Sequence, residues 1–202
     1  LNKKALDVLV RSEALISLMD ERFIGLKHFW KCIAKERPRK VEAFHENIEN
    51  YRHGWTDEED KKVRLQYTKE ERIENLVGLT GLYPFHLVIT EKSLKKLEDI
   101  RCPPISEYDP HLRAVWFIIR SKTVKKTKHG KEYWIVDCID NAGGTNSIKC
   151  WGVRPDKDNE RIQLNKPYMA VPEYNEQWGF STRSIKHNFR IIKEERNESV
   201  KI

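Results

Sequence analysis

The chain has 202 residues, of which 39% are hydrophobic and six are tryptophans, so it is long enough and apolar enough to form globular cores. No run of about 18 apolar residues occurs, which excludes a membrane-spanning helix, and the start LNKKALDVLV lacks the apolar core of a signal peptide. The net charge of +7 comes from the C-terminal part, because residues 1–111 hold 20 basic and 20 acidic residues and residues 112–202 hold 18 and 11. We therefore expect a cytoplasmic globular protein with a basic module that attracts nucleic acid; a basic surface that serves only solubility is the alternative.

Residues 1 to about 100 show apolar residues at helical spacing. Two stripes carry this pattern: Phe23, Leu26, Trp30 and Ile33, and then Val41, Phe44, Ile48 and Tyr51. Thr56 with Glu59, and Thr68 with Glu71, have the spacing of a capping box, in which each side chain bonds the other's backbone N–H. This part is predicted to be a helical domain whose stripes face a core.

A break in helical order follows at EDIRCPPISEYDPHLR, residues 98–113. Two adjacent prolines and a third at Pro110 favour extended backbone. The sequence therefore predicts a domain boundary near Pro110, with domains over residues 1–110 and 111–202.

The second domain shows β-rich runs separated by turn signals. Five strands are predicted, from LRAVWFIIRSKTV, EYWIVDCID, NSIKCWGV, PYMAVPEY and GFSTRSIKHNFRII. A short helix or loop fits the polar segment RPDKDNERIQLNK before the fourth strand. The whole chain is thus expected to be α+β, an N-terminal helical domain followed by a five-stranded OB-fold β-barrel, which commonly binds oligonucleotides across strands 2 and 3.

The candidate DNA-binding residues lie in this second domain. Five lysines bracket the first hairpin turn and would pair with phosphates: Lys122, Lys125, Lys126, Lys128 and Lys131. Exposed aromatic residues would stack on bases, and the candidates are Tyr133, Trp134, Trp151 and Trp178. Arg183, in the fifth predicted strand, is a further candidate. Strand alternation puts Tyr133 and Trp134 on opposite faces, so at most one of them is on the outer surface. For each aromatic residue a place in the core is an equal alternative.

No catalytic or metal site is expected. Asp137 and Asp140, three residues apart, would not face one site, and Asp140 suits a bond to its own turn. His28 and Cys32 are four apart on one helical face, but no second ligand pair completes a zinc site. The remaining cysteines, Cys102, Cys138 and Cys150, are expected as free thiols, with Cys138 and Cys150 as core residues, and no cofactor is expected.

Three segments, in order, resemble the C-terminal region of the bacterial replicative DNA polymerase III α subunit, a C-family polymerase that is also encoded by phages. They are LNKKALDVLVRSEALISLMDERFIGL, which resembles the family's segment after the helix-hairpin-helix region, then ERIENLVGLTGLYPF, and TKHGKEYWIVDCIDNAGG, which is similar to a Thr-Lys-x-Gly-Lys hairpin. The chain differs where the family usually has glycine, at Glu13, and histidine, at Tyr83. Because the chain begins with Leu1, we expect a piece of a longer protein.

The resemblance implies a non-catalytic part of a DNA-directed DNA polymerase that holds single-stranded template DNA. The expected partners are single-stranded DNA, duplex DNA through the parent chain, and the remainder of the polymerase. A sliding-clamp peptide is not recognisable, since QYTKEER lacks the terminal aromatic pair. Two alternatives stay open: a protein-docking OB module whose basic loop meets an acidic partner, and a free-standing protein that binds single-stranded nucleic acid.

Overall fold

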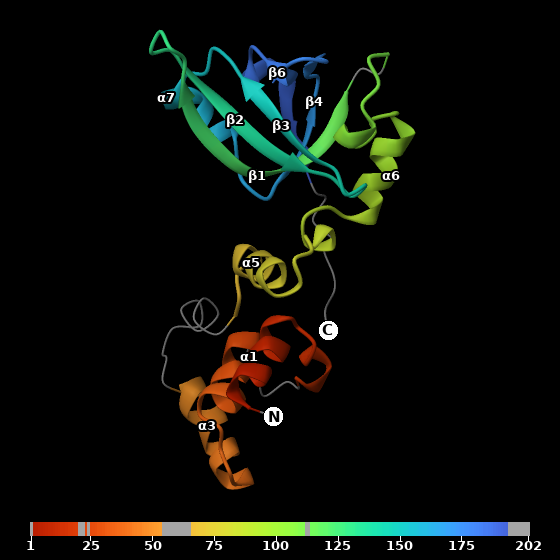
Figure 1. Cartoon of the computed structure of the whole chain (residues 1–202). Helices are drawn as coiled ribbons and strands as arrows, with labels where there is room; N and C mark the ends of the chain where they lie inside the picture. The colour runs from red at the N-terminus through yellow and green to blue at the C-terminus, as the bar shows by residue number, and fades with distance from the viewer. Residues whose placement is uncertain (1, 20–22, 24, 54–65, 112–113, 194–202) are drawn as a thin grey trace. The chain divides into compact units, whose positions relative to one another are not determined.

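The computed structural model describes residues 2–19, 23, 25–53, 66–111 and 114–193, which are drawn in colour in Figure 1. The chain divides into two compact units, Leu1–Pro84 and Phe85–Ile202. The first is helical and the second is built on a β-sheet, so the predicted α+β order is confirmed. Within the described residues, no helix is both long and apolar enough to cross a membrane.

The helical unit consists of short helices joined by tight turns. They are α1 (Lys3–Arg11), a 3-10 turn (Ile16–Leu18), α2 (Leu26–Trp30), a π-helical turn (Lys31–Lys35), α3 (Val41–His53) and α5 (Lys69–Thr80). The capping box predicted at α5 is confirmed, because Thr68 Oγ1 accepts from the Glu71 N–H at 3.2 Å and Glu71 Oε2 accepts from the Thr68 N–H at 2.8 Å. The other predicted box, Thr56 with Glu59, lies outside the described residues.

Seven of the eight residues of the predicted stripes face the core of this unit. Its main cluster buries Val10, Phe23, Leu26, Phe29, Cys32 and Ile48, and the partly buried Trp30, Ile33, Phe44 and Tyr51 pack against it. Phe23 packs there although it precedes α2, whereas Val41 is 67% exposed in the first turn of α3. Helical spacing thus predicted the core-facing residues of the two stripes except at Val41.

An ion pair joins the end of α1 to α5. Arg72 donates from Nε and Nη2 to the two carboxylate oxygens of Glu13, at 2.5 and 2.8 Å. Glu13 has a backbone φ of +64°, in the left-handed region that costs a non-glycine residue about 1–2 kcal/mol. The two-pronged contact with Arg72 offsets that strain and fixes the turn after α1.

The second unit is a curled, mixed sheet of seven strands with short helices (Figure 1). The strands are β1 (Val115–Lys126), β2 (Glu132–Ile139), β3 (Thr145–Cys150), β4 (Pro167–Ala170), β5 (Glu173–Asn175), β6 (Gly179–Thr182) and β7 (Phe189–Ile191). Their order in the sheet is β5-β6-β3-β2-β1-β4-β7, and β3 with β6 is the parallel pair among otherwise antiparallel neighbours.

Helical pieces surround this sheet. They are two 3-10 turns (Phe85–Leu87 and Ile105–Glu107), α6 (Glu91–Asp99), α7 (Pro155–Asp158) with the 3-10 turn Asn159–Arg161, and α8 (Ile185–Asn188). α7 begins with Pro155 at its first position, which suits a residue without an N–H. It lies in the polar segment where a short helix or loop was predicted.

The prediction of five strands is corrected to seven, because two of the predicted strands are each divided. The fourth is interrupted at Pro172, which has no N–H for the ladder, so β4 and β5 pair with different neighbours. The fifth is interrupted by α8, before which Thr182 Oγ1 accepts from the Asn188 side chain at 2.7 Å. A run of β-forming residues therefore indicated strand content but not continuity.

The β-sheet unit begins at Phe85, well before the boundary predicted near Pro110. Ser106 donates its N–H to Asp140 Oδ2 at 2.8 Å, and the Trp116 N–H donates to the Pro103 carbonyl at 2.9 Å. Gly144 allows this close approach, because a Cβ there would lie 2.4 Å from Ser106 Cβ. The proline-rich segment breaks the helix as predicted but packs on the sheet instead of linking two domains.

Candidate nucleic-acid interface

The lysine-rich hairpin forms the turn between β1 and β2. Thr127 closes it, since the Thr127 N–H donates to the Lys131 carbonyl at 2.9 Å and Thr127 Oγ1 accepts from the Lys131 N–H at 3.1 Å. Gly130 has φ +78°, a conformation that glycine adopts without strain. Four of the five predicted lysines gather in exposed positions at this end of the sheet: Lys125, Lys126, Lys128 and Lys131. Lys126 is partly neutralised by Glu132 at 3.6 Å.

A β-bulge decides which way the lysines of β1 point. Ile119 pairs with the buried Cys138, but after the bulge Ser121 pairs with the outward Asp137, so the alternation of β1 changes phase between them. As a result Lys125 pairs with Tyr133 and shares its outer face. Without this extra residue Lys125 would point to the buried side of the sheet.

Lys122 and Trp134 are on the other side of the sheet, and the stacking role predicted for Trp134 is corrected here. Trp134 is 1% exposed and belongs to the core. Lys122 pairs with Val136, places Nζ 4.5 Å from the Trp134 ring centroid, and donates to the Asn159 side chain. The cation covers the ring by a cation–π contact, so Lys122 serves the core and not the outer surface.

The outer face carries a stacked aromatic pair. The rings of Tyr133 and Trp151 lie 4.4 Å apart at an interplanar angle of 25°. Trp151 is 36% exposed. Its backbone N–H donates to the Thr182 carbonyl at 2.8 Å, which holds the residue beside β6. Two rings stacked in this way offer a flat surface on which a further ring can stack.

A second aromatic residue extends from the β5–β6 turn. Trp178 is 62% exposed, and Asn175 Oδ1 holds the turn by accepting from the Gln177 and Trp178 N–H groups at 2.9 and 3.1 Å. Lys149 Nζ lies 5.5 Å from the Trp178 ring centroid and donates to the Trp178 carbonyl at 3.0 Å. Lys149 was not predicted as a site residue, although its two-residue spacing from Trp151 on one strand would have indicated a shared face.

We call Lys125, Tyr133, Lys149, Trp151 and Trp178 the aromatic–lysine face. Arg183 follows β6, whose Ser181 pairs with Lys149, and it lies 3.9 Å from Glu173 in an exposed ion pair. Such a pair is worth about 0–1 kcal/mol, so Arg183 can exchange Glu173 for another anion. The structure thus brings predicted residues from β1, β2, the β1–β2 and β5–β6 turns and the ends of β3 and β6 into one half of the sheet.

The two candidate carboxylates have separate structural roles. Asp137 accepts hydrogen bonds from Ser121 Oγ and Ser147 Oγ, both at 2.6 Å, and so ties β1, β2 and β3 together. Asp140 is fully buried and accepts from the Ala142 and Gly144 N–H groups at 3.1 Å, which confirms the predicted bond to its own turn. The two carboxylates share none of these hydrogen-bond partners.

Cys32, Cys138 and Cys150 lie in the cores, and Cys102 is buried beside Pro103 at the start of the proline-rich segment. Burial raises the pKa of Cys138, and it raises the pKa of Cys150 to about 12, so both are neutral thiols at physiological pH. Cys32 is buried in the helical unit, where burial likewise raises its pKa to about 12, and the His28 ring nitrogen lies 3.2 Å from the Ile48 carbonyl. Among the described residues, no three His, Cys, Asp or Glu side chains come together as metal ligands.

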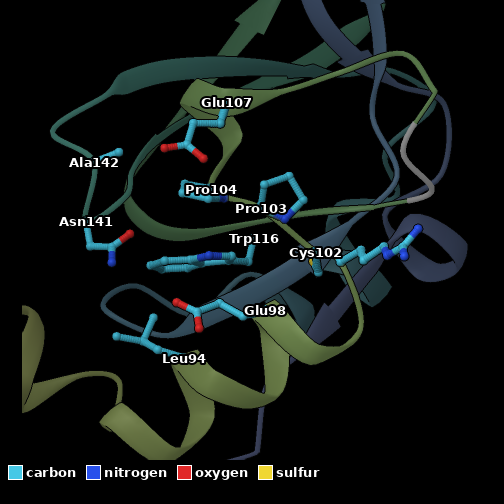
Figure 2. Close-up of a pocket in the computed structure, with 10 residues that line it drawn as sticks. Leu94, Glu98, Cys102, Pro103, Pro104, Glu107, Trp116, Asn141 and Ala142 are labelled. Atoms are coloured by element: carbon cyan, nitrogen blue, oxygen red, sulfur yellow. The ribbon is translucent and has the colours of Figure 1, made fainter.

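A cavity of about 620 Å³ lies at the other end of β2, beside the β2–β3 turn. Figure 2 shows the Trp116 indole in its wall, with Pro104 on one side and Glu98 on the other, and the carboxylate of Glu107 and the amide of Asn141 nearby. The wall holds two carboxylates, Glu98 and Glu107, against one cation, Arg101, and this net negative charge disfavours a polyanion. This cavity is therefore distinct from the aromatic–lysine face.

No protein-family model matches the chain, and no curated protein matches it.

Proposed function

We propose that the β-sheet unit binds single-stranded DNA across the aromatic–lysine face, as a non-catalytic part of a replicative C-family DNA polymerase. The Tyr133–Trp151 stack carries this proposal, because a rigid aromatic pair at an exposed surface matches the flat face of an unpaired base. In duplex DNA the base faces are already stacked on one another, so this surface suits a single strand. Each base stacked on protein aromatics contributes about 1–3 kcal/mol.

The charges around the stack suit a sugar-phosphate chain. Lys125 lies opposite Tyr133 on β1, and Lys149 lies two residues before Trp151 on β3, so cations flank the stack on neighbouring strands. The exposed lysines of the β1–β2 turn continue the positive charge. Each phosphate that such a cation neutralises releases counterions, which favours binding at low salt.

The strand order supports an OB-type barrel. β4 and β5 are separated only by Val171 and Pro172, so together they can be taken as one bent strand that pairs with β1 and with β6. The pairings then run from β1 to β2, β3, β6, the bent strand and back to β1, with α7 between β3 and β4. OB-folds bind oligonucleotides on strands 2 and 3 and the loops beside them, where the aromatic–lysine face lies.

The link to the polymerase family rests on the succession of three segments and gains support from Glu13. The family usually has glycine at that position, and Glu13 has the left-handed backbone that glycine adopts without strain. The parent gene tests this part of the proposal separately. A reading frame without an upstream region containing the metal-binding carboxylates of a polymerase would reject it.

Fluorescence anisotropy of the whole chain with a labelled oligothymidylate, measured over a range of salt concentrations, tests DNA binding. Trp151→Ala should raise the Kd about 5- to 150-fold, as expected from the loss of ~1–3 kcal/mol of stacking. Lys125→Ala should reduce the slope of log K against log salt by about 0.7, the value for one phosphate on a single strand.

Lys95→Ala is the matched control, since Lys95 is exposed on α6, a helix that lines the cavity at the end of β2 opposite to the lysine hairpin. It should change neither quantity. No binding at low salt, or the same effect from Trp151→Ala and Lys95→Ala, would refute the proposal. Binding of an acidic protein with no binding of the oligonucleotide would instead favour a protein-docking module.

A further inference from the structure

A second cavity, of about 860 Å³, opens on the helical unit. It lies between the π-helical turn and the first turns of α3, next to α1. Its wall combines three cations, Arg37, Arg39 and Lys40, with an apolar side that includes Val41 and Phe44. Its volume falls in the range of small-ligand sites, about 300–1,000 Å³.

The three cations are exposed and available. No ion pair between described residues involves Arg37, Arg39 or Lys40. Glu36, the acidic residue in the wall, already accepts a hydrogen bond from the Tyr51 hydroxyl at 2.5 Å. The wall therefore carries a net positive charge that suits an anion with several oxygen acceptors, such as a phosphate group.

The backbone gathers these cations in a strained turn. Arg37 has φ +50°, a left-handed conformation that costs a residue of this type about 1–2 kcal/mol, and Pro38 restricts the next φ. Strained backbone is retained where the surrounding structure holds it, often at ligand sites. Here it places three cationic side chains within four residues at one cavity mouth.

The apolar side of the cavity calls for more than a bare phosphate. Val41 is 67% exposed in the first turn of α3, and Phe44 and Ile33 are half-buried beside it. An inorganic anion would leave these side chains in water. A ligand with a flat, weakly polar ring on one side and a phosphate on the other would cover the apolar side and pair with the cations at once.

We propose that this cavity binds a nucleotide, with the phosphate held by Arg37, Arg39 and Lys40 and the base lying against Val41 and Phe44. The nucleotide can be free or can belong to a nucleic-acid strand, because both present the same phosphate and base. The cavity lies in the helical unit, whereas the aromatic–lysine face lies in the β-sheet unit. Its failure would leave the proposed function untouched, and the reverse also holds.

Titration of the ¹⁵N-labelled whole chain with deoxyadenosine monophosphate, followed by amide NMR, tests the proposal. The amides of Val41, Phe44 and their neighbours should shift, and inorganic phosphate or deoxyadenosine alone should shift them much less. The same shifts with phosphate alone would overturn the nucleotide assignment. No shift in this region at millimolar ligand would overturn the site itself.

The double variant Arg39→Gln/Lys40→Gln should raise the Kd for deoxyadenosine monophosphate at least tenfold, and Lys35→Gln, which removes an exposed cation outside the cavity wall, should leave it unchanged. Val41→Ser should weaken the nucleotide more than inorganic phosphate. Equal effects of the double variant and Lys35→Gln would refute a defined site. Weaker oligonucleotide binding by the double variant would identify a nucleotide within a strand, and unchanged oligonucleotide binding a free one.

Discussion

Gly144→Ala probes the contact that joins the proline-rich segment to the sheet. The new Cβ would lie 2.4 Å from Ser106 Cβ and 3.0 Å from Ser106 Oγ, well inside ordinary contact. Ser106 Cβ is bonded directly to the backbone and cannot rotate away. The β2–β3 turn or the segment around Ser106 must therefore move. That movement strains the hydrogen bond from the Ser106 N–H to the buried Asp140 carboxylate, now 2.8 Å long.

The expected cost follows from these two effects. Overpacking costs about 1–3 kcal/mol, and a hydrogen bond to a charged group contributes about 1.5–3 kcal/mol. Moving the segment relieves the overlap between the two Cβ atoms but weakens the hydrogen bond to Asp140. The total cost is therefore smaller than the sum of the two separate costs. We expect Gly144→Ala to lower the free energy of unfolding by ~2–3 kcal/mol.

Urea unfolding followed by tryptophan fluorescence measures this, since Trp116 and Trp134 are buried in the β-sheet unit. A double-mutant cycle with Ser106→Gly isolates the clash, because glycine at 106 removes the atoms that the new methyl group meets. In that background Gly144→Ala should cost less than half as much. A coupling energy below ~0.5 kcal/mol, or a stable Gly144→Ala single variant, would refute the reasoning.

Lys122→Ala should lower the free energy of unfolding by ~0.5–1 kcal/mol, because it uncovers the Trp134 ring. It should leave the slope of log K against log salt for oligonucleotide binding unchanged. A slope reduced as much as by Lys125→Ala would contradict the placement of these two lysines on opposite faces. The four cysteines should resist a thiol reagent at about pH 8 in the folded protein and react in concentrated urea, because burial raises the pKa of each thiol, and one rapidly labelled native thiol would disprove this. The hydrogen bond to Glu36 raises the pKa of Tyr51 from 10.0 to about 12. The stability that this hydrogen bond contributes is therefore fully present below pH 10.0 and is lost as the pH rises towards 12. Tyr51→Phe should flatten this part of the pH dependence of unfolding, and identical curves for both proteins would argue against the bond.

Features that depend on a few neighbouring residues were predictable. The Thr68–Glu71 capping box closes over three residues, and Asp140 bonds to N–H groups two and four residues ahead. The alternation that separates Tyr133 from Trp134 depends only on extended backbone. Such signals need no knowledge of the rest of the chain, since their partners are fixed by sequence distance.

The site itself required contacts between distant segments. The sequence could not tell that Trp151 would lie on Tyr133 or that Trp178 would lie over Lys149, because strand pairing and a turn bring each pair together. The same holds for Pro103 and Pro104, which ended the helix as expected yet joined the sheet through Trp116. Composition cannot distinguish a linker from a segment that packs.

By itself the sequence determined that a helical part precedes a basic β-rich part, and which residues could provide cations and rings at a surface. The tertiary structure decided which of them share a surface. One bulge in β1, between Ile119 and Ser121, turns Lys122 towards the core and Lys125 towards Tyr133. The physical reason is that side chains alternate along a strand, so a single extra residue reverses the face of every residue after it.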